Sequence, residues 1–325
     1  MQVVRRIQRS IKENLLTLLI PFYNEESCIQ ETLNAVIKYL NNMEIPYELI
    51  LINDGSTDQS LNLVKKTITK FKLKKGRVIS FTRNFGKEAA ITAGLKFSKG
   101  DLVIPFDSDL QDPPEIIFEM IKKWEEGYDI VNAVRKYREG ETFFKKITAF
   151  YFYRLLKLIS SIDIEKDTGD FRLLDKKVVE AILLLPERTR FMKGLYSWVG
   201  YKKTSIYFRR NSRLKSKSNL SYFYLINHAL DGIFSFSKVP LTIISILGLI
   251  ISSVSIIYAL YLIIKTIILG VDVPGYASLM TALLFLGGIQ LISLGVLGEY
   301  LARVFLEVKK RPLYLIAANS KINED

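Results

Sequence analysis

Residues 101–111 read DLVIPFDSDLQ, a short apolar run that ends at two aspartates separated by one serine. An apolar run of this length that stops at polar turn residues is typical of a buried strand. Side chains at positions i and i+2 of an extended segment project to the same face, so Asp107 and Asp109 can converge on one hard cation. The stretch therefore predicts a strand over residues 101–106 with a cation and phosphate site at its end, although surface turns also contain Asp-x-Asp.

The chain on either side of this stretch alternates between apolar runs and amphipathic segments. Runs such as LLTLLIP and YELILIN predict buried strands, and apolar residues at helical spacing predict helices between them. This alternation indicates an α/β fold with a mostly parallel, doubly wound sheet. Ligands bind such sheets at the carboxyl ends of the strands, where the polar motifs fall. The predicted strands are residues 15–21, 47–53, 77–81 and 101–106, and the predicted helices are residues 26–41 and 89–97.

Two further motifs, PFYNEE and DTGDFR, contain residues suited to binding a nucleotide or to catalysis. Tyr23 could stack on a base, and Glu25 or Asp54 could accept hydrogen bonds from base or ribose. A helix N-terminus rich in acidic residues explains the same residues without a ligand. In the second motif, Asp170 could serve as a base and Arg172 could bind a phosphate. A glycine-containing turn with a local salt bridge is the alternative there.

Hydrophobicity is concentrated in the last third of the chain. Apolar residues make up 49% of the 325 residues although 24% are charged, and nearly all long apolar runs follow Val239. Residues 241–264 and 277–297 are each long enough to cross about 30 Å of hydrocarbon. The positive-inside rule places their basic outer flanks, and with them both termini, in the cytoplasm and the loop 270–275 outside. A buried helical hairpin of a soluble protein is the alternative.

The remaining predictions concern the N-terminal residues, two amphipathic segments and the division of the chain into units. The N-terminal residues are basic and lack the apolar core of a signal peptide, so we expect the α/β domain to stay in the cytosol. Two aromatic and basic segments read as interfacial helices, the first of which fits a core position equally well. The predicted units are a tail (1–14), the α/β domain (15–218, with an amphipathic helix over 141–161), a juxtamembrane interfacial helix (219–238), a two-helix hairpin (239–305) and a cytoplasmic tail (306–325).

Charge and rare residues exclude several classes of function. The net charge is +13, and residues 201–220 are basic without an acid just before the apolar segments. This location favours lipid headgroups and phosphates over nucleic acid, for which no recognition motif is present. Cys28 is the single cysteine, so no intrachain disulfide can form, and we expect a small buried side chain. The single histidine, His228, excludes an HExxH zinc site and a Ser-His-Asp triad.

The sequence motifs indicate a particular protein family only when they are considered together. PFYNEE, NDGSTD, RNFGKE, FDSDLQDPPE, DTGDFR and LPERTRFMKG follow one another between residues 15 and 194. This set resembles the family-two glycosyltransferases of GT-A fold, in the dolichyl-phosphate mannose synthase-like branch. The two apolar spans, with ALDGIFSFS before them and VDVPGYASLM between them, resemble those of bacterial polyprenyl-phosphate (bactoprenol) glucosyltransferases.

The resemblance implies a reaction and its setting. The expected enzyme is an integral protein of the bacterial inner membrane with a cytoplasmic catalytic domain. It transfers a hexose, with glucose from UDP-glucose expected, to undecaprenyl phosphate by an inverting displacement, and so supplies lipid-linked sugar for cell-surface glycans. The expected cofactor is Mg²⁺ or Mn²⁺, and the expected partners are the nucleotide-sugar, the polyprenyl phosphate and membrane lipids. A homo-oligomer, a different nucleotide-sugar and a non-catalytic membrane scaffold stay open as alternatives.

The resemblance also implies a role for each matching residue. Asp170 is the expected catalytic base, and Arg172 and Arg138 are expected at the acceptor phosphate. Asp107, Asp109 and Gln111 match the metal positions. The positions expected to bind the nucleotide-sugar are Pro21, Tyr23, Glu25, Ile52, Asp54, Asp107, Ser108, Arg135 and Arg213.

One segment departs from the family pattern. After Arg213, Ser216 stands where the family has glycine and Asn219 stands where it has lysine. The expected clamp on the diphosphate is therefore rebuilt or weakened, and this departure motivates the scaffold alternative.

Overall fold

A computed structural model describes residues 9–73, 75–136, 168–188, 190–209, 239–269 and 275–322. The predicted interfacial helices over 141–161 and 219–238 lie outside these residues. So do Arg138, Arg213 and the departing segment around Ser216 and Asn219.

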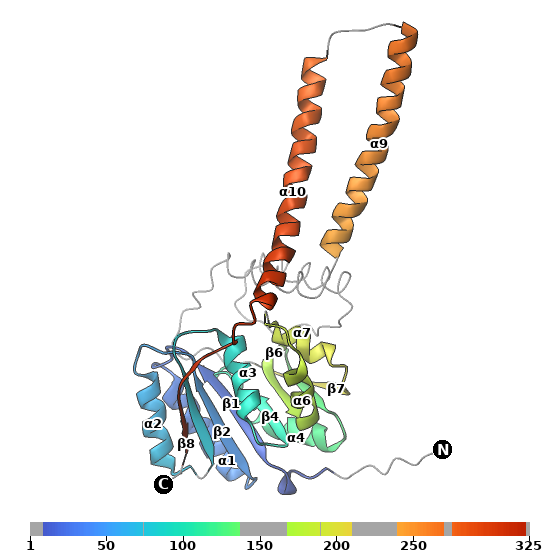
Figure 1. The fold of residues 1–325 in the computed structure, drawn as a ribbon. Helices are drawn as coiled ribbons and strands as arrows, with labels where there is room; N and C mark the ends of the chain where they lie inside the picture. The colour runs from blue at the N-terminus through green and yellow to red at the C-terminus, as the bar shows by residue number, and fades with distance from the viewer. Residues whose placement is uncertain are drawn as a thin grey trace, which may run out of the picture.

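An eight-stranded sheet forms the centre of the N-terminal domain, with strand order β7-β5-β6-β4-β1-β2-β3-β8 (Figure 1). Strands β4, β1, β2 and β3 are mutually parallel, whereas β6 runs antiparallel to both β4 and β5. The fold class is therefore the predicted α/β arrangement with a mostly parallel sheet. The strands are β1 (Leu16–Phe22), β2 (Tyr47–Asn53), β3 (Gly76–Phe81), β4 (Leu102–Pro105), β5 (Ile130–Arg135), β6 (Thr168–Asp175), β7 (Lys203–Phe208) and β8 (Ile316–Lys321).

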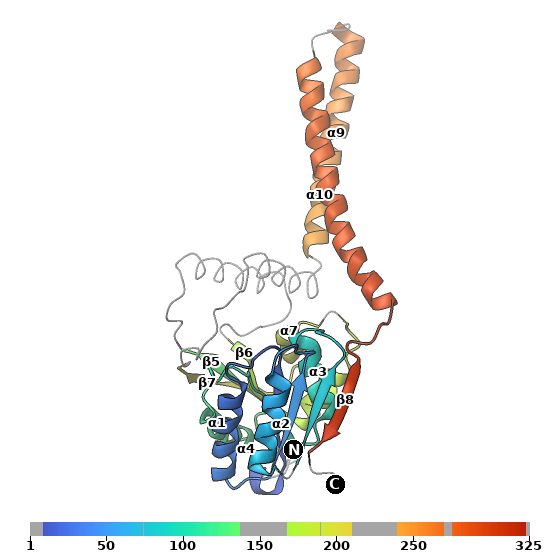
Figure 2. The same cartoon turned by 90° about the vertical axis from the view of Figure 1, so that its left-hand side faces the viewer.

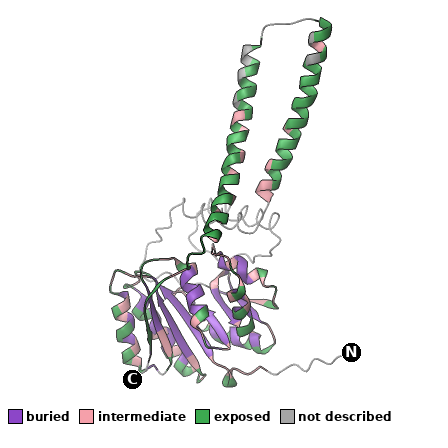
Figure 3. Cartoon of the chain, viewed as in Figure 1, coloured by how far each residue is buried: buried purple, intermediate pink, exposed green. Residues whose placement is uncertain are grey.

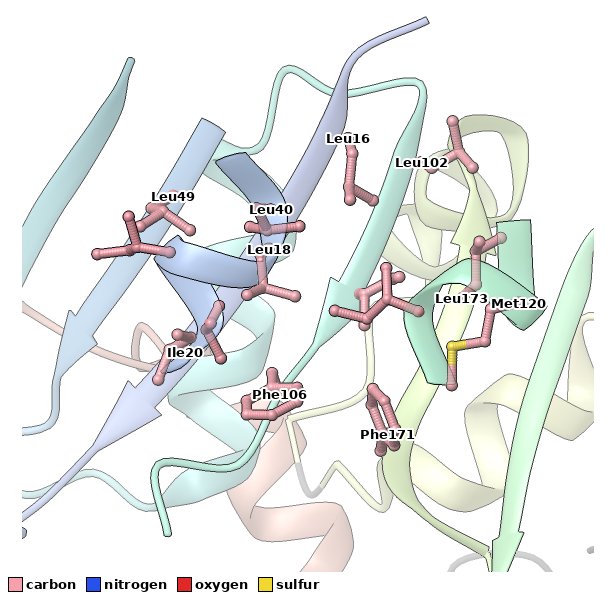
Figure 4. Packing of buried hydrophobic residues seen from close by; sticks show 14 of the residues in the cluster. Leu16, Leu18, Ile20, Leu40, Leu49, Leu102, Phe106, Met120, Phe171 and Leu173 are labelled. Atoms are coloured by element: carbon pink, nitrogen blue, oxygen red, sulfur yellow. The ribbon is translucent and has the colours of Figure 1, made fainter. Parts of the chain in front are cut away.

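Helices cover both faces of the sheet, because alternate side chains of each buried strand point to opposite faces. Leu16, Leu18 and Ile20 of β1 belong to one core cluster, whereas Leu19 belongs to the other (Figure 4). One face packs against α1 (Ile29–Asn42), α2 (Ser60–Phe71) and α4 (Ile116–Glu125), and the other against α3 (Lys87–Phe97), α6 (Lys176–Leu184) and α7 (Met192–Trp198). The central strands β1 and β4 are consequently buried along their whole length, and β2 is buried after its first residue (Figure 3).

Two long helices project from this domain (Figures 1 and 2). Helix α9 (Val239–Leu269) and helix α10 (Tyr276–Val308) contain the predicted spans, with mean hydropathy 2.4 and 1.9 over their candidate segments. None of the residues in either apolar window is buried. By length and composition, these are the two described helices that could cross a membrane, and they are not arranged as the buried hairpin of a soluble protein.

The chain returns to the sheet after α10. Strand β8 pairs antiparallel with β3 at the edge of the sheet, with Ile79 opposite Asn319. The Tyr314 ring stacks on Phe81 with 4.9 Å between ring centroids, and the Leu315 carbonyl accepts a hydrogen bond from the Thr82 N–H. Part of the segment 306–325, to which the sequence analysis assigned no element, is therefore a strand of the domain that precedes the helices.

Candidate active site

The candidate site lies where parallel strands end and an antiparallel strand begins. Asp107 and Asp109 follow the carboxyl end of β4, as predicted. Because β6 runs antiparallel to β4, its first residues lie at this same edge of the sheet. Asp170 is the third residue of β6. The topology thereby brings together carboxylates that are about sixty positions apart in the sequence.

A lysine joins two of these carboxylates. The Lys87 ammonium, in the first turn of α3, lies 2.6 Å from Asp107 Oδ1 and 2.7 Å from Asp170 Oδ2. The two aspartate side chains are 20% and 13% exposed. Burial acts to raise the pKa of Asp170, but the positive charges of Lys87 and Lys193 outweigh it and hold that pKa well below its usual range. Asp170 is therefore an anion at neutral pH.

The second oxygen of Asp170 has a different environment. Asp170 Oδ1 is buried and has no hydrogen-bond partner among the residues that the structure describes. A buried carboxylate oxygen costs free energy when it is left without a donor. The hydrogen-bonding capacity of this oxygen is therefore unused in the described part of the chain, and because the atom is fully buried, a donor can reach it only if neighbouring side chains move.

Basic side chains surround Asp170. Arg172 projects from the same face of β6, donates a hydrogen bond to the Gly169 carbonyl at 2.6 Å, and stacks on Tyr196 with its guanidinium 4.0 Å from the ring centroid. Arg172 is only 3% exposed. Burial lowers the pKa of Lys193, and the positive charges of Arg172 and Arg135 lower it further. The surroundings of Asp170 therefore form an electropositive region suited to phosphate groups.

Glu88, next to Lys87, adds a buried acid to this region. Burial, followed by the negative charge of Asp170, raises the pKa of Glu88 to about 8. Its Oε2 accepts a hydrogen bond from the Met192 N–H at 3.3 Å, which ties α3 to the start of α7. The motifs RNFGKE and LPERTRFMKG contain Lys87, Glu88 and Lys193, but no role for these three residues was predicted from the sequence. The motif set was the available signal, but nothing in the sequence paired these residues with Asp170.

The loops after β1 and β2 form the neighbouring part of the site. Asn24 has φ of 52°, and its Oδ1 accepts a hydrogen bond from the Thr57 N–H at 2.9 Å. The Glu25 N–H donates to Ser60 Oγ at 2.8 Å. Tyr23, 43% exposed, is available for stacking. The PFYNEE and NDGSTD motifs are therefore linked directly by hydrogen bonds.

Asp54 makes a specific structural contact in this region. Its Oδ1 and Oδ2 accept hydrogen bonds from the N–H groups of Phe85 and Gly86 at 2.7 and 2.9 Å. The side chain is buried, and burial raises its pKa despite these bonds. Asp54 thus holds the loop that leads into α3 and Lys87. Pro21 and Ile52 are opposite each other in the β1–β2 register, next to the ends of the two strands.

Helix α1 makes a hydrogen bond to the loop that contains Asp107 and Asp109. The Ser108 carbonyl accepts a hydrogen bond from Thr32 Oγ1 at 2.7 Å. Cys28 lies beside it with its Sγ 3.0 Å from Glu25 Oε2, and burial raises the pKa of the thiol to about 12. Cys28 is buried, and its thiol is protonated at neutral pH, which confirms the expected small buried side chain.

The carboxylates after β4 are the type of donor that a hard divalent cation takes together with a phosphate ligand. Within the described ranges, no group of three or more His, Cys, Asp or Glu side chains is placed to hold a metal ion. Mg²⁺ needs fewer, since it takes one or two carboxylates together with waters and substrate phosphates. Asp107 and Asp109 supply two such carboxylates two positions apart, and Asp109 Oδ1 also accepts the Gln111 N–H at 3.3 Å.

The sheet therefore places two aspartates after β4 and a third carboxylate at the start of the neighbouring β6. The profile of glycosyl transferase family 2 matches residues 17–183, and that of the GtrB C-terminal hairpin matches residues 239–304. The chain belongs to glycosyl transferase family 2.

Two relatives are similar to this chain along nearly its whole length. An uncharacterized glycosyltransferase of Synechocystis sp. is 53% identical over 93% of this chain and 94% of its own length. The SfII prophage-derived bactoprenol glucosyl transferase of Shigella flexneri is 43% identical over 95% of this chain and 99% of its own length. Among solved structures, a mannosyltransferase of Pyrobaculum calidifontis has a TM-score of 0.48 at 15% identity, covering 68% of this chain and 63% of that one.

Proposed function

We propose that this glycosyltransferase moves a hexose, glucose from UDP-glucose, onto a polyprenyl phosphate at the cytoplasmic face of a bacterial membrane. The observation that carries the proposal is the meeting of Asp107 and Asp170 around one ammonium, while a buried oxygen of Asp170 has no hydrogen-bond partner among the described residues. Two neighbouring carboxylate sites, one for a donor diphosphate and one for an acceptor, are what a direct sugar transfer requires. The polyprenyl acceptor and the glucose are supported by relatives that are named bactoprenol glucosyl transferases.

The donor is assigned to the ends of β1, β2 and β4. Tyr23 stacks on the base, while Glu25 and the loop that Asp54 holds surround the nucleoside, together with Pro21 and Ile52. Asp107 and Asp109, with Gln111, would hold Mg²⁺ or Mn²⁺, which supplies positive charge to the departing diphosphate. Ser108, Arg135 and Arg213 complete the proposed set of nucleotide-sugar contacts.

The acceptor is assigned to the electropositive region around Asp170. A phosphate monoester has a second pKa near ~6, so it is largely dianionic at neutral pH. Its oxygen attacks the anomeric carbon as the bond from that carbon to the diphosphate oxygen breaks, and UDP leaves with the electron pair. Asp170, the base that the family resemblance implies, orients the acceptor or stabilises positive charge on the sugar, and its lowered pKa makes it only a weak base toward a monoanionic acceptor. Arg172 is buried against Tyr196 and supports this region, with Arg138 as a proposed contact from outside the described residues.

The membrane placement rests on the C-terminal hairpin. Helices α9 and α10 match the hairpin profile, and basic residues flank the pair on the outer sides. A polyprenyl chain stays in the hydrocarbon while its phosphate reaches a catalytic domain on the same side as those basic flanks.

A direct assay tests the proposal. The purified full-length chain in detergent is given a panel of nucleotide-sugars with undecaprenyl phosphate, with and without Mg²⁺ or Mn²⁺. We expect UDP release and a glucosyl lipid product that require both the lipid phosphate and the cation. Product from another nucleotide-sugar would correct the donor, whereas no transfer from any donor would favour the scaffold alternative. UDP release that is independent of lipid phosphate would contradict the assigned acceptor.

A further inference from the structure

Lys87 lies between two carboxylates to which the proposed function gives different tasks. We propose that Lys87 is a positioning residue, whose ammonium sets the separation of the donor carboxylate Asp107 and the catalytic carboxylate Asp170. The inference rests on the proposed function and adds a residue to it. It explains how a sheet with two independent strand ends presents both carboxylates to one reacting centre.

The three groups come from different elements. Lys87 belongs to the first turn of α3, Asp107 to the loop after β4, and Asp170 to the beginning of β6. An ammonium has three N–H donors, and contacts of 2.6 and 2.7 Å are short even for charge-assisted hydrogen bonds. The ammonium is therefore a direct link across the β4–β6 boundary.

Hydrogen bonds hold the backbone at the start of α3, and this fixes the position of the Lys87 backbone. Asp54 accepts the N–H groups of the two residues that precede Lys87. Gly86 has φ of 98°, a left-handed conformation that favours glycine, and it lets the chain turn into the helix. The position of Lys87 consequently depends on the same loop that borders the nucleoside site.

Electrostatics gives the link a consequence for the rate. Asp107, Asp109 and Asp170 are like charges at one strand edge, and two phosphate-bearing substrates bring more negative charge. Without the ammonium, Asp107 and Asp170 would repel each other and move apart. Displacements of about 1 Å in a catalytic group lower rates by about 10²-fold.

Lys87 does not contribute to the core, which makes the inference testable by substitution. Its side chain is 46% exposed, so a Lys87→Met variant should fold. Lys87→Arg keeps the charge. Lys96→Met is the matched control, because Lys96 is exposed near the other end of the same helix.

The experiment compares these variants of the full-length chain in detergent. It measures kcat and KM for the nucleotide-sugar with saturating undecaprenyl phosphate, and the affinity for Mn²⁺ with UDP by titration calorimetry. We expect Lys87→Met to lower kcat by about 10²-fold while KM and the affinity for Mn²⁺ with UDP change by less than about threefold. Lys87→Arg should recover at least about a tenth of the wild-type kcat, and Lys96→Met should match the wild type.

Other outcomes would overturn the inference. A raised KM with unchanged kcat would make Lys87 a donor ligand, and parallel losses of kcat, UDP affinity and Tm would make it a structural residue. Failure of the proposed function is distinguishable, since the wild-type chain would then transfer no sugar. In that case the Tm values of Lys87→Met, Asp170→Asn and the double variant decide: non-additive shifts support the link between the two residues, and additive shifts contradict it.

Discussion

At the scale of single residues, the two carboxylate oxygens of Asp170 have different environments. Lys87 holds one carboxylate oxygen at 2.7 Å, while the other oxygen is buried without a partner in the described part of the chain. The neighbouring positive charges keep the group ionised. A carboxylate that is ionised and oriented is suited to orient an acceptor or to balance positive charge on the sugar, whereas its lowered pKa makes it a weak base.

Asp170→Asn should lower kcat by about 10²- to 10⁴-fold, because the amide keeps the shape of the side chain but cannot act as a base or balance positive charge. The measurement is the rate of sugar transfer to lipid phosphate at saturating donor. Asp129→Asn is the matched control. Asp129 also pairs with basic residues, Arg9 and Lys177, but it lies just before β5, at the end of the strands opposite to Asp170. Wild-type rates in Asp170→Asn would remove this residue from the mechanism.

Glu88 predicts a pH dependence of stability. Its pKa of about 8 in the folded chain exceeds its ordinary 4.5, so the folded state binds more protons than the unfolded state between these two values. The free energy of unfolding should therefore fall as pH rises through this window, by at most about 1.4 kcal/mol per pH unit from this group. In Glu88→Gln this contribution disappears, so the variant should gain on the wild type between pH 5 and 8. Urea unfolding at several pH values checks this, and parallel profiles would contradict it.

At the scale of secondary structure, β8 connects the apolar helices back to the catalytic sheet. The backbone N–H of Arg188 donates to Glu307 Oε1 at 2.7 Å near the end of α10, and Tyr314 stacks on Phe81 immediately before β8. The strand also covers the edge of β3, which would otherwise present unpaired backbone groups. The orientation of the catalytic domain relative to α10 is therefore set by contacts as well as by chain connectivity.

Tyr314→Ala should lower the free energy of unfolding of the catalytic domain by about 1–3 kcal/mol, because it removes a stacked aromatic pair and its buried area. Denaturant unfolding followed by fluorescence measures the change. Tyr207→Ala is the control, since Tyr207 is 63% exposed on the edge strand β7; we expect a change within about 0.5 kcal/mol. Equal effects of the two substitutions would show that the Tyr314 contact does not stabilise the domain.

At the scale of the whole molecule, the protein is elongated. The catalytic domain, including the C-terminal strand β8, forms one end, and the two apolar helices extend to the other (Figure 2). The carboxyl ends of the parallel strands, the start of α9 and the end of α10 lie toward the same end of the catalytic domain (Figures 1 and 2). This arrangement suits a reaction between a water-soluble donor and a phosphate attached to a lipid.

The proposed topology can be tested by cysteine labelling, because the single native Cys28 is buried and gives little background. Gly275→Cys, at the start of α10, should react with a membrane-impermeant maleimide in intact cells. Lys309→Cys, just after α10, should react only after the membrane is opened. The reverse labelling pattern would place the catalytic domain on the outer face and contradict the positive-inside prediction.

Sequence periodicity alone predicted the strands β1 to β4, the helices α1 and α3 and both apolar spans, because buried strands and spans leave long apolar signals. The polar motif after the fourth predicted strand marked Asp107 and Asp109 as candidates, and the DTGDFR motif marked Asp170, although no strand was predicted there. Strand β8 gave no signal, because its six residues are exposed and do not alternate. Only the tertiary structure joined Asp107, Lys87 and Asp170, since that contact depends on β6 running antiparallel beside β4, and long-range strand pairing leaves no mark in the local sequence.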